Sequence, residues 1–158
     1  MHHTAAVWKF SRALALPCLL AGMTAAASGA TTDEGPTGYW TTVDDDGKTP
    51  MSVVRIFDKN QRLYGNVVQL INPKRKDPKC DDCDGANKGK PILGMQIMWN
   101  LEKNGSEWSG GHILDPNNGK IYKCYIEVLD GGQRLKVRGY IGISLLGRTQ
   151  YWRRTTRP

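Results

Sequence analysis

The sequence predicts an all-β protein built as a single antiparallel up-and-down barrel of eight strands. Glycine and Asn/Asp turn residues recur at short intervals from Gly35 onward, and almost no window shows the 3.6-residue period of a helix. The segments between these turns are short, apolar or alternating, and follow one another through tight connections, which favours antiparallel hairpins. Eight such strands can close on themselves and leave an interior for side chains or for one small ligand.

Residues 1–30 are predicted to be a secretory signal peptide, and residues 31–158 the barrel domain. Lys9 and Arg12 form a charged start, Ala13 to Gly22 an apolar run, and Ala25 to Ala30 a small-residue cleavage region. The apolar run is too short to span a bilayer, and no later segment is longer. We therefore expect a periplasmic or secreted protein with no membrane span.

The eight strands are predicted by their apolar pattern and by the turn residues between them. Asn104-Gly105, between the fourth and fifth strands, is the strongest short hairpin signal. In the sixth strand, Tyr122, Cys124 and Ile126 alternate with polar residues and therefore share one face with Val128. The predicted strands are Gly38 to Val43, Met51 to Phe57, Leu63 to Leu70, Ile92 to Leu101, Glu107 to Leu114, Ile121 to Leu129, Leu135 to Ile141 and Arg148 to Arg153.

One connection, Asn72 to Pro91, is long and has no strand pattern, and it contains Cys80 and Cys83. In an oxidising compartment these two cysteines are expected to form a disulfide with each other, or one of them with Cys124. Asp81 and Asp82 between them disfavour a reactive thiolate. A structural zinc site usually shows two paired ligand spacings, and this chain has one. A stapled loop is the favoured interpretation, and thiol or metal handling at Cys80 and Cys83 is an alternative.

The two ends of the domain are expected to meet. Trp40 lies in the first strand and Arg153 near the end of the last, and a barrel closes by pairing these strands. A guanidinium stacked on the indole would plug one end of the barrel.

Several motifs together resemble the exported bacterial family DUF2147. They are Gly38-Tyr39-Trp40, Asp45-Asp46-Gly47-Lys48, Asp77-Pro78-Lys79-Cys80-Asp81-Asp82-Cys83, the stretch from Gly111 to Lys120, the stretch from Leu135 to Tyr140, and the stretch from Gly147 to Arg153. The resemblance implies a lipocalin-like or calycin-like barrel with no established activity. Lipocalins likewise open with Gly-x-Trp and end with an arginine packed over that Trp. Gly38, Trp40 and Arg153 carry this likeness, with Arg154 as the substitute for Arg153.

No catalytic residues, metal site or cofactor are predicted. After residue 30 the only histidine is His112, so a nucleophile would have a single base available. The acidic run Asp44 to Gly47 is interpreted as a hairpin turn, because no glutamate stands at the twelfth position of a calcium loop. Residues 31–158 hold 20 basic and 15 acidic residues, a modest and dispersed excess that does not favour a nucleic-acid partner.

The function favoured by these observations is binding of a small apolar or amphipathic ligand inside the barrel. The residues expected to line the lumen or its rim are Trp99, Trp108, Tyr122, Tyr140, Leu145 and Leu146. The alternative is an envelope interaction or structural module whose lumen is filled by side chains. An open cavity would favour the first interpretation, and a packed barrel the second.

Overall fold

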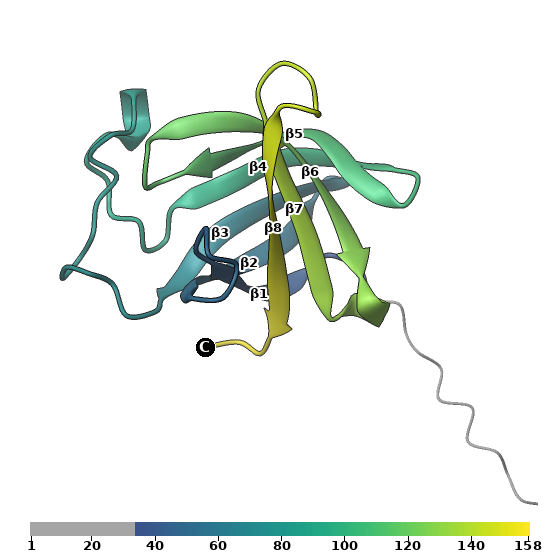
Figure 1. Ribbon diagram of the computed structural model, residues 1–158, viewed down its shortest axis with the longest axis horizontal. Helices are drawn as coiled ribbons and strands as arrows, with labels where there is room; N and C mark the ends of the chain where they lie inside the picture. Colours follow the sequence, from purple (N-terminus) through teal and green to yellow (C-terminus); the bar gives the residue numbers. More distant parts are fainter. Residues whose placement is uncertain (1–33) are drawn as a thin grey trace, which may run out of the picture. The chain divides into compact units, whose positions relative to one another are not determined.

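The computed structural model describes residues 34–158, which form a closed antiparallel barrel whose eight strands pair in chain order (Figure 1). The predicted fold class is therefore confirmed. The strands are β1 (Gly38–Val43), β2 (Pro50–Lys59), β3 (Arg62–Leu70), β4 (Gln96–Asn104), β5 (Glu107–Asp115), β6 (Lys120–Leu129), β7 (Arg134–Tyr140) and β8 (Gly147–Thr155), with short 3-10 turns at Gly85–Asn87 and Asp130–Gly132. The predicted signal peptide lies outside the described residues.

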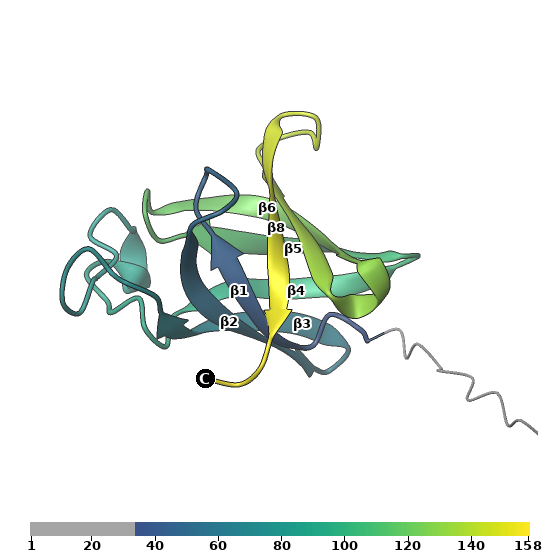
Figure 2. The same cartoon turned by 60° about the horizontal axis from the view of Figure 1, so that its bottom comes forward.

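Most strand ends lie within one to three residues of the predicted bounds, and two larger or more consequential differences have a clear physical reason. Strand β4 begins at Gln96 because Ile92 belongs to the loop, where its N–H donates to Pro78 O at 3.0 Å. Strand β8 continues past Arg153 to Thr155, because Thr155 pairs with Tyr39 of β1. Residues 153–155 pair with residues 39–41 of β1 and so close the barrel, and Figure 2 shows β1 and β8 side by side.

The core follows the inward face of each strand. Cys124 and Ile126 of β6 are fully buried, as the alternation of that strand predicted. Two tryptophans, Trp40 and Trp152, are the largest fully or almost fully buried side chains and come from the first and last strands. The core is therefore built around the seam where the barrel closes.

The order of the strands decides at which of the two ends of the barrel each turn or loop lies. In an antiparallel meander alternate turns lie at the same end, so residues 44–49, 71–95, 116–119 and 141–146 gather at one end, which we call the mouth end. The remaining turns gather at the opposite end together with residues 34–37, and we call this the closed end. The long loop at 71–95 and the turn at 141–146 both project from the barrel body in Figures 1 and 2.

The closed end is sealed by Trp40 and Arg154. The Trp40 side chain is fully buried, and its Nε1 donates to Pro36 O at 2.8 Å. The Arg154 guanidinium stacks over the indole with Cζ 4.2 Å from the ring centroid. The same guanidinium donates hydrogen bonds to the carbonyl oxygens of Gly132, Thr37, Glu34 and Gly35, with distances of 3.0 Å to Thr37, 3.2 Å to Glu34 and 2.6 Å to Gly35. The Arg154 side chain thus hydrogen-bonds backbone carbonyl groups of two separate segments, the one before β1 and the β6–β7 turn.

The arginine in this position is Arg154, so the prediction of Arg153 was wrong and its stated substitute is correct. Trp152 points into the core, and strand alternation therefore turns Arg153 outward and Arg154 inward. Arg153 is exposed and pairs with Thr41 in the β1–β8 register.

Gly38 is required at the closed end by its backbone angle and by the arginine. Its φ of +121° lies in a region that favours glycine, and a Cβ at this position would stand 3.0 Å from Nη1 of Arg154. In the Gly-x-Trp motif, Gly38 therefore leaves room for the Arg154 guanidinium, and Trp40, two residues later, supplies the indole on which that guanidinium stacks.

We predict that Arg154→Ala lowers the free energy of unfolding by about 2–4 kcal/mol, because it removes the stack and several charge-assisted hydrogen bonds from a largely buried site. Arg153→Ala is the matched control, and we expect a change within about 0.5 kcal/mol because the side chain is exposed. Chemical denaturation of both variants measures the difference. Equal losses in the two variants would contradict the assignment of Arg154 as the closing residue.

Candidate ligand-binding site

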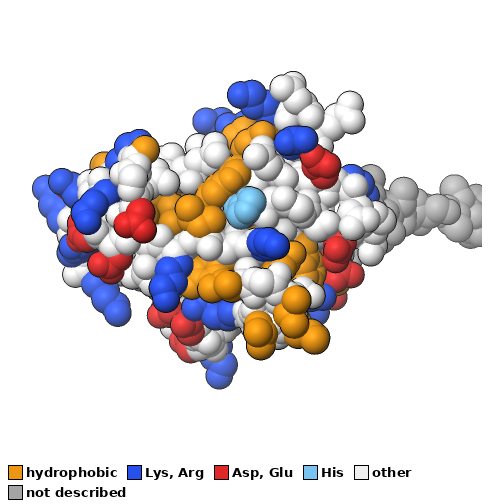
Figure 3. All heavy atoms as spheres, turned by 90° about the horizontal axis from the view of Figure 1, so that it is seen from above, with side chains coloured by type: hydrophobic (Ala, Val, Ile, Leu, Met, Phe, Trp, Pro, Cys, Tyr) orange, Lys and Arg blue, Asp and Glu red, His pale blue; other side chains and the backbone are white. Residues whose placement is uncertain are grey.

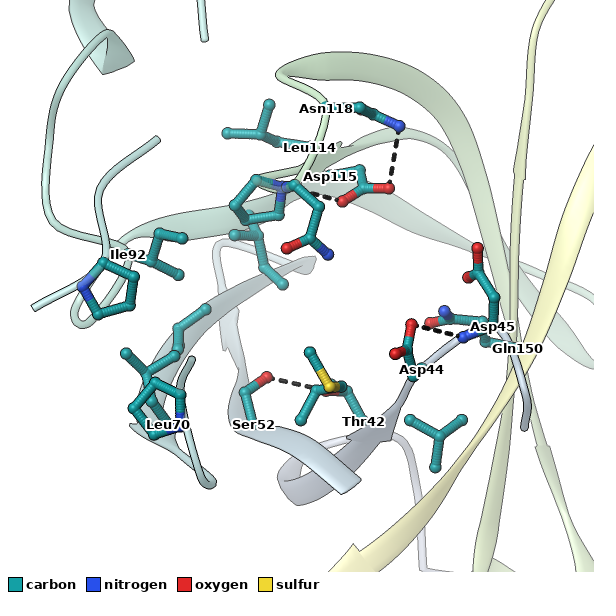
Figure 4. A pocket seen from close by; sticks show the side chains of 18 of the residues that line it. Thr42, Asp44, Asp45, Ser52, Leu70, Ile92, Leu114, Asp115, Asn118 and Gln150 are labelled. Atoms are coloured by element: carbon teal, nitrogen blue, oxygen red, sulfur yellow. Dashed lines mark hydrogen bonds between the residues drawn. The ribbon is translucent and has the colours of Figure 1, made fainter. Parts of the chain in front are cut away.

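A cavity of about 1030 Å³ opens at the mouth end of the barrel. Its floor is apolar and draws on five strands, β3, β4, β5, β7 and β8, through Val67, Ile97, Ile113, Val137 and Trp152. Higher up, Leu70 and Ile92 line the wall, and Figure 4 shows both side chains at the cavity. The lower part of the cavity is therefore suited to an apolar group.

Polar side chains that face the cavity are satisfied by one another. Thr42 Oγ1 and Ser52 Oγ lie 2.8 Å apart on neighbouring strands, and this hydroxyl pair is visible in Figure 4. Trp152 Nε1 donates to Gln150 Oε1 at 3.0 Å. Because these groups already have partners, the cavity wall carries little unsatisfied polarity below the rim.

The rim is charged and centres on Arg148 at the start of β8. Its Nη1 lies 2.7 Å from Asp45 Oδ1, and its Nη2 lies 3.7 Å from Asp115 Oδ2. Asp115 Oδ2 also accepts a hydrogen bond from Asn118 Nδ2 at 3.1 Å, and the same Nδ2 lies 3.2 Å from Tyr122 Oη. Arg148 and the Asp45 carboxylate are half-exposed or more, so this network contributes little stability. The network does link three turns of the mouth end to one another: the β1–β2, β5–β6 and β7–β8 turns.

The long loop at 71–95 forms the remaining wall. Cys80 and Cys83 are joined by a disulfide and are both buried. Arg75 Nη2 lies 2.6 Å from Asp81 Oδ2 and donates to Lys79 O at 2.9 Å. A bridge between Lys79 and Pro91 ties the two arms of the loop together. The loop is thus a cross-linked unit with internal hydrogen bonds.

This loop packs directly on the β5–β6 turn. Gly119 has φ +68°, and a Cβ at Gly119 would overlap Asp82 O and stand 2.7 Å from Cys83 N. The Cys80 sulfur lies 3.4 Å from Pro116 O. A side chain at position 119 would therefore push the disulfide loop off the barrel.

The acidic run at the β1–β2 turn is turn chemistry, as predicted. Asp46 accepts hydrogen bonds from the Thr49 hydroxyl at 2.6 Å and from the N–H groups of Lys48 and Thr49, each at 2.8 Å. These bonds, the Thr49 hydroxyl first, hold the pKa of Asp46 below its usual value. Asp44 and Asp45 of the same run line the cavity. Among residues 34–158, no group of three His, Cys, Asp or Glu side chains is arranged to hold a metal ion.

Of the six residues predicted to line the lumen or rim, Tyr122 alone lines this cavity. Trp99 faces outward from β4, because Met98 beside it takes the buried position, and it stacks on His112 with ring centroids 5.8 Å apart. Tyr140 is also on the outer face, 6.4 Å from the Tyr125 ring. The prediction was wrong for both of these residues.

The other three predicted residues are also outside the cavity. Trp108 packs half-buried against the core next to the β4–β5 turn, with Lys103 Nζ 3.5 Å from its ring centroid. Leu145 and Leu146 belong to the mouth end, as expected, but they project into solvent. Aromatic and aliphatic composition alone did not show on which face each strand residue lies.

Sequence reasoning missed Trp152, Gln150, Arg148 and Asp115 as cavity residues. Asp115 and Asn118 belong to the β5–β6 connection, which must lie at the mouth end of an eight-strand meander. Counting alternate turns could have placed them there. Trp152 could have been assigned to the cavity only if it had been known which residues of β8 face the interior.

Cys124 is the free cysteine of the described chain, and it lies in the core. Burial away from water raises the pKa of its thiol, because the thiolate loses its hydration. The thiol is therefore held neutral and behaves as a small apolar side chain.

The fold and its one-ended cavity define a lipocalin-like barrel. The chain is similar to a solved structure described as protein HP1028 from the human pathogen Helicobacter pylori, which belongs to the lipocalin family. The TM-score is 0.66 at 19% sequence identity, over 76% of this chain and 82% of that one, so the likeness is one of fold. Residues 38–154 match the family model DUF2147, described as an uncharacterized protein conserved in bacteria, and the chain belongs to that family. No curated protein matches it.

We predict that Cys80→Ser/Cys83→Ser lowers the free energy of unfolding by about 2 kcal/mol, the loss expected for so short a closed loop. Denaturation of the wild type with and without reductant, beside the double variant, measures this. Reductant should shift the wild type to the value of the variant and leave the variant unchanged. A wild type insensitive to reduction would contradict a stabilising role of the disulfide.

The buried thiol also predicts a pH dependence. Because the native pKa of Cys124 is raised, its contribution to stability is fully present below the unfolded-state pKa near 8.5–9 and is lost as the pH rises further. We expect the stability of the wild type to fall by about 1.4 kcal/mol per pH unit between pH 9 and 11 relative to Cys124→Ala. Parallel pH profiles in the two proteins would contradict this account.

Proposed function

We propose that this protein is an exported, non-enzymatic carrier that binds one small amphipathic molecule in its barrel. The observation that carries the proposal is the cavity of about 1030 Å³, with an apolar floor and a charged rim. Cavities of this order hold lipid-sized or drug-sized ligands, and such sites are mostly apolar with a few placed polar groups.

The distribution of side chains in the cavity suggests how the ligand lies. Its apolar part would rest on the floor against Trp152 and Val137, where burial of apolar surface supplies the binding free energy. Its polar part would stay at the rim near Arg148, Asp115 and Tyr122, which offer both donors and acceptors. A molecule with one apolar and one polar end fits this arrangement better than a uniformly polar one.

The placement of the reactive side chains supports a non-enzymatic role. His112 is stacked on Trp99 on the outer face and does not line the cavity. Cys80 and Cys83 are bonded to each other and buried, so in this state neither sulfur is free for thiol chemistry or metal binding. Cys124 is held neutral in the core. Of the described residues, those that line the cavity thus include no histidine and no cysteine, the side chains most often used as general base and thiol nucleophile.

An exported location is supported by the predicted signal peptide and by the disulfide. A disulfide such as Cys80–Cys83 is typical of the periplasm or of secreted proteins. Within residues 34–158, no helix has the length and apolar character needed to cross a bilayer.

The cavity also argues against the alternative function, that of an interaction or structural module whose lumen is filled by side chains. That alternative expects the lumen to be filled by side chains, whereas a cavity of about 1030 Å³ opens at the mouth end, beside the partly exposed Leu70, Ile92 and Ile113. The discriminating feature therefore favours ligand binding.

We predict that Ile113→Trp weakens binding of a dansyl-labelled fatty acid by at least about tenfold, or about 1.4 kcal/mol, because an indole would occupy the apolar floor. Ile121→Trp is the matched control, since Ile121 is an isoleucine of the adjacent strand β6 that points into solvent. Fluorescence titration gives both dissociation constants, and near-ultraviolet circular dichroism shows that both variants are folded.

Unchanged probe binding in folded Ile113→Trp would contradict the proposed site. The same holds if Ile113→Trp and Ile121→Trp weaken binding equally, because the probe would then bind the outer surface.

A further inference from the structure

The β7–β8 turn at the mouth end carries an exposed aliphatic cluster. Its side chains are Ile141, Ile143, Leu145 and Leu146, which we call the apolar tip. Leu145 is 82% exposed, and the other three are between 61% and 70% exposed. None of them lines the cavity, and the turn projects from the barrel at the top of Figure 1. Exposed aliphatic side chains gathered in this way usually mark an interaction site.

The tip is held in one conformation by its own backbone and by Arg138. Ile141 N–H donates to Leu146 O at 3.2 Å, and Leu146 N–H donates to Ile143 O at 3.1 Å. Arg138 Nε donates to Ser144 O at 2.8 Å, and its Nη2 donates to Leu145 O at 3.2 Å. The carbonyl groups of residues 143–146 are therefore all hydrogen-bonded. This matters for an apolar surrounding, because an unpaired carbonyl in hydrocarbon costs several kcal/mol.

The hairpin that carries the tip is basic. The part of the hairpin that leads to the tip, residues 136–150, contains Lys136, Arg138 and Arg148 and no Asp or Glu. Arg138 beneath the tip has no acidic partner among the described residues. Lys123 adds a further charge, because it pairs with Tyr140 next to the tip and is exposed. Figure 3 shows Lys and Arg side chains among hydrophobic ones on the face seen from above.

Exposed aliphatic side chains with Lys and Arg side chains next to them fit the surface of an anionic bilayer. Aliphatic side chains enter the boundary between headgroups and acyl chains, while Lys and Arg stay at the level of the lipid phosphates. A second protein is a poorer fit, because a stable protein interface needs about 800 Å² per partner and four side chains on a narrow projection offer much less.

We propose that the mouth end docks on anionic lipid bilayers by inserting the apolar tip. Arg148, two residues after Leu146, belongs to the cavity rim, so docking would bring the cavity opening close to the lipid headgroups. The docked barrel would exchange its amphipathic ligand directly with the bilayer, a role that rests on the proposed function. Docking itself requires no ligand.

The test is flotation of the mature protein with vesicles of 30% phosphatidylglycerol and 70% phosphatidylcholine, and with vesicles of phosphatidylcholine alone. The variant is Ile143→Ser/Leu145→Ser/Leu146→Ser, and the control is Leu93→Ser, an exposed leucine of the long loop. We expect the triple variant to bind the anionic vesicles at least about tenfold more weakly than the wild type. Leu93→Ser should bind as the wild type does, and added salt should weaken wild-type binding.

Equal binding by the wild type and the triple variant would overturn the proposal, and so would absence of wild-type binding. A wild type that sediments as a dimer, with a monomeric triple variant, would also overturn it, because the tip would then bind a second copy of the chain. The triple variant should bind the dansyl-labelled fatty acid in vesicle-free solution as the wild type does, and loss of that binding would place the tip in the cavity instead. A wild type that floats with vesicles but binds no probe would contradict the proposed function and leave docking supported.

Discussion

The stack of Arg154 on Trp40 is the contact on which the closed barrel depends. It joins the first strand to the last, and one guanidinium donates hydrogen bonds to the backbone carbonyl groups of Glu34, Gly35, Thr37 and Gly132. Because both side chains are largely buried, neither can be removed without leaving polar groups or a void at the seam. The cavity lies at the other end of the barrel, the mouth end.

The strands and their closure could be predicted from the sequence because turn residues and alternation are local signals. The cavity residues could not be predicted, because they depend on which of the alternating residues in each strand face the interior. In β8, Tyr151 and Trp152 are both plausible inward residues, and pairing of Trp152 with Leu135 in the core decides between them. In β4, Met98 rather than Trp99 takes the buried position, so the larger aromatic residue lies outside. Tyr122 was placed correctly because β6 has the clearest alternation.

The mouth end combines features that are far apart in the sequence. The disulfide loop rests on Gly119, the Arg148 network links three turns, and the apolar tip stands beside them. The meander accounts for this arrangement, since alternate connections must share one end. An apolar floor, a charged rim and an exposed aliphatic tip at the same end are the observations behind the proposed exchange of an amphipathic ligand with a lipid surface.

The central claim is that the cavity holds an amphipathic ligand, and native mass spectrometry tests it most directly. The mature protein would be isolated from its own cell envelope without detergent, and its native and denatured masses compared. We predict a native mass that exceeds the denatured mass by one small molecule, which is released on denaturation and extracts into organic solvent. Identical native and denatured masses, with no species in the extract, would contradict the account.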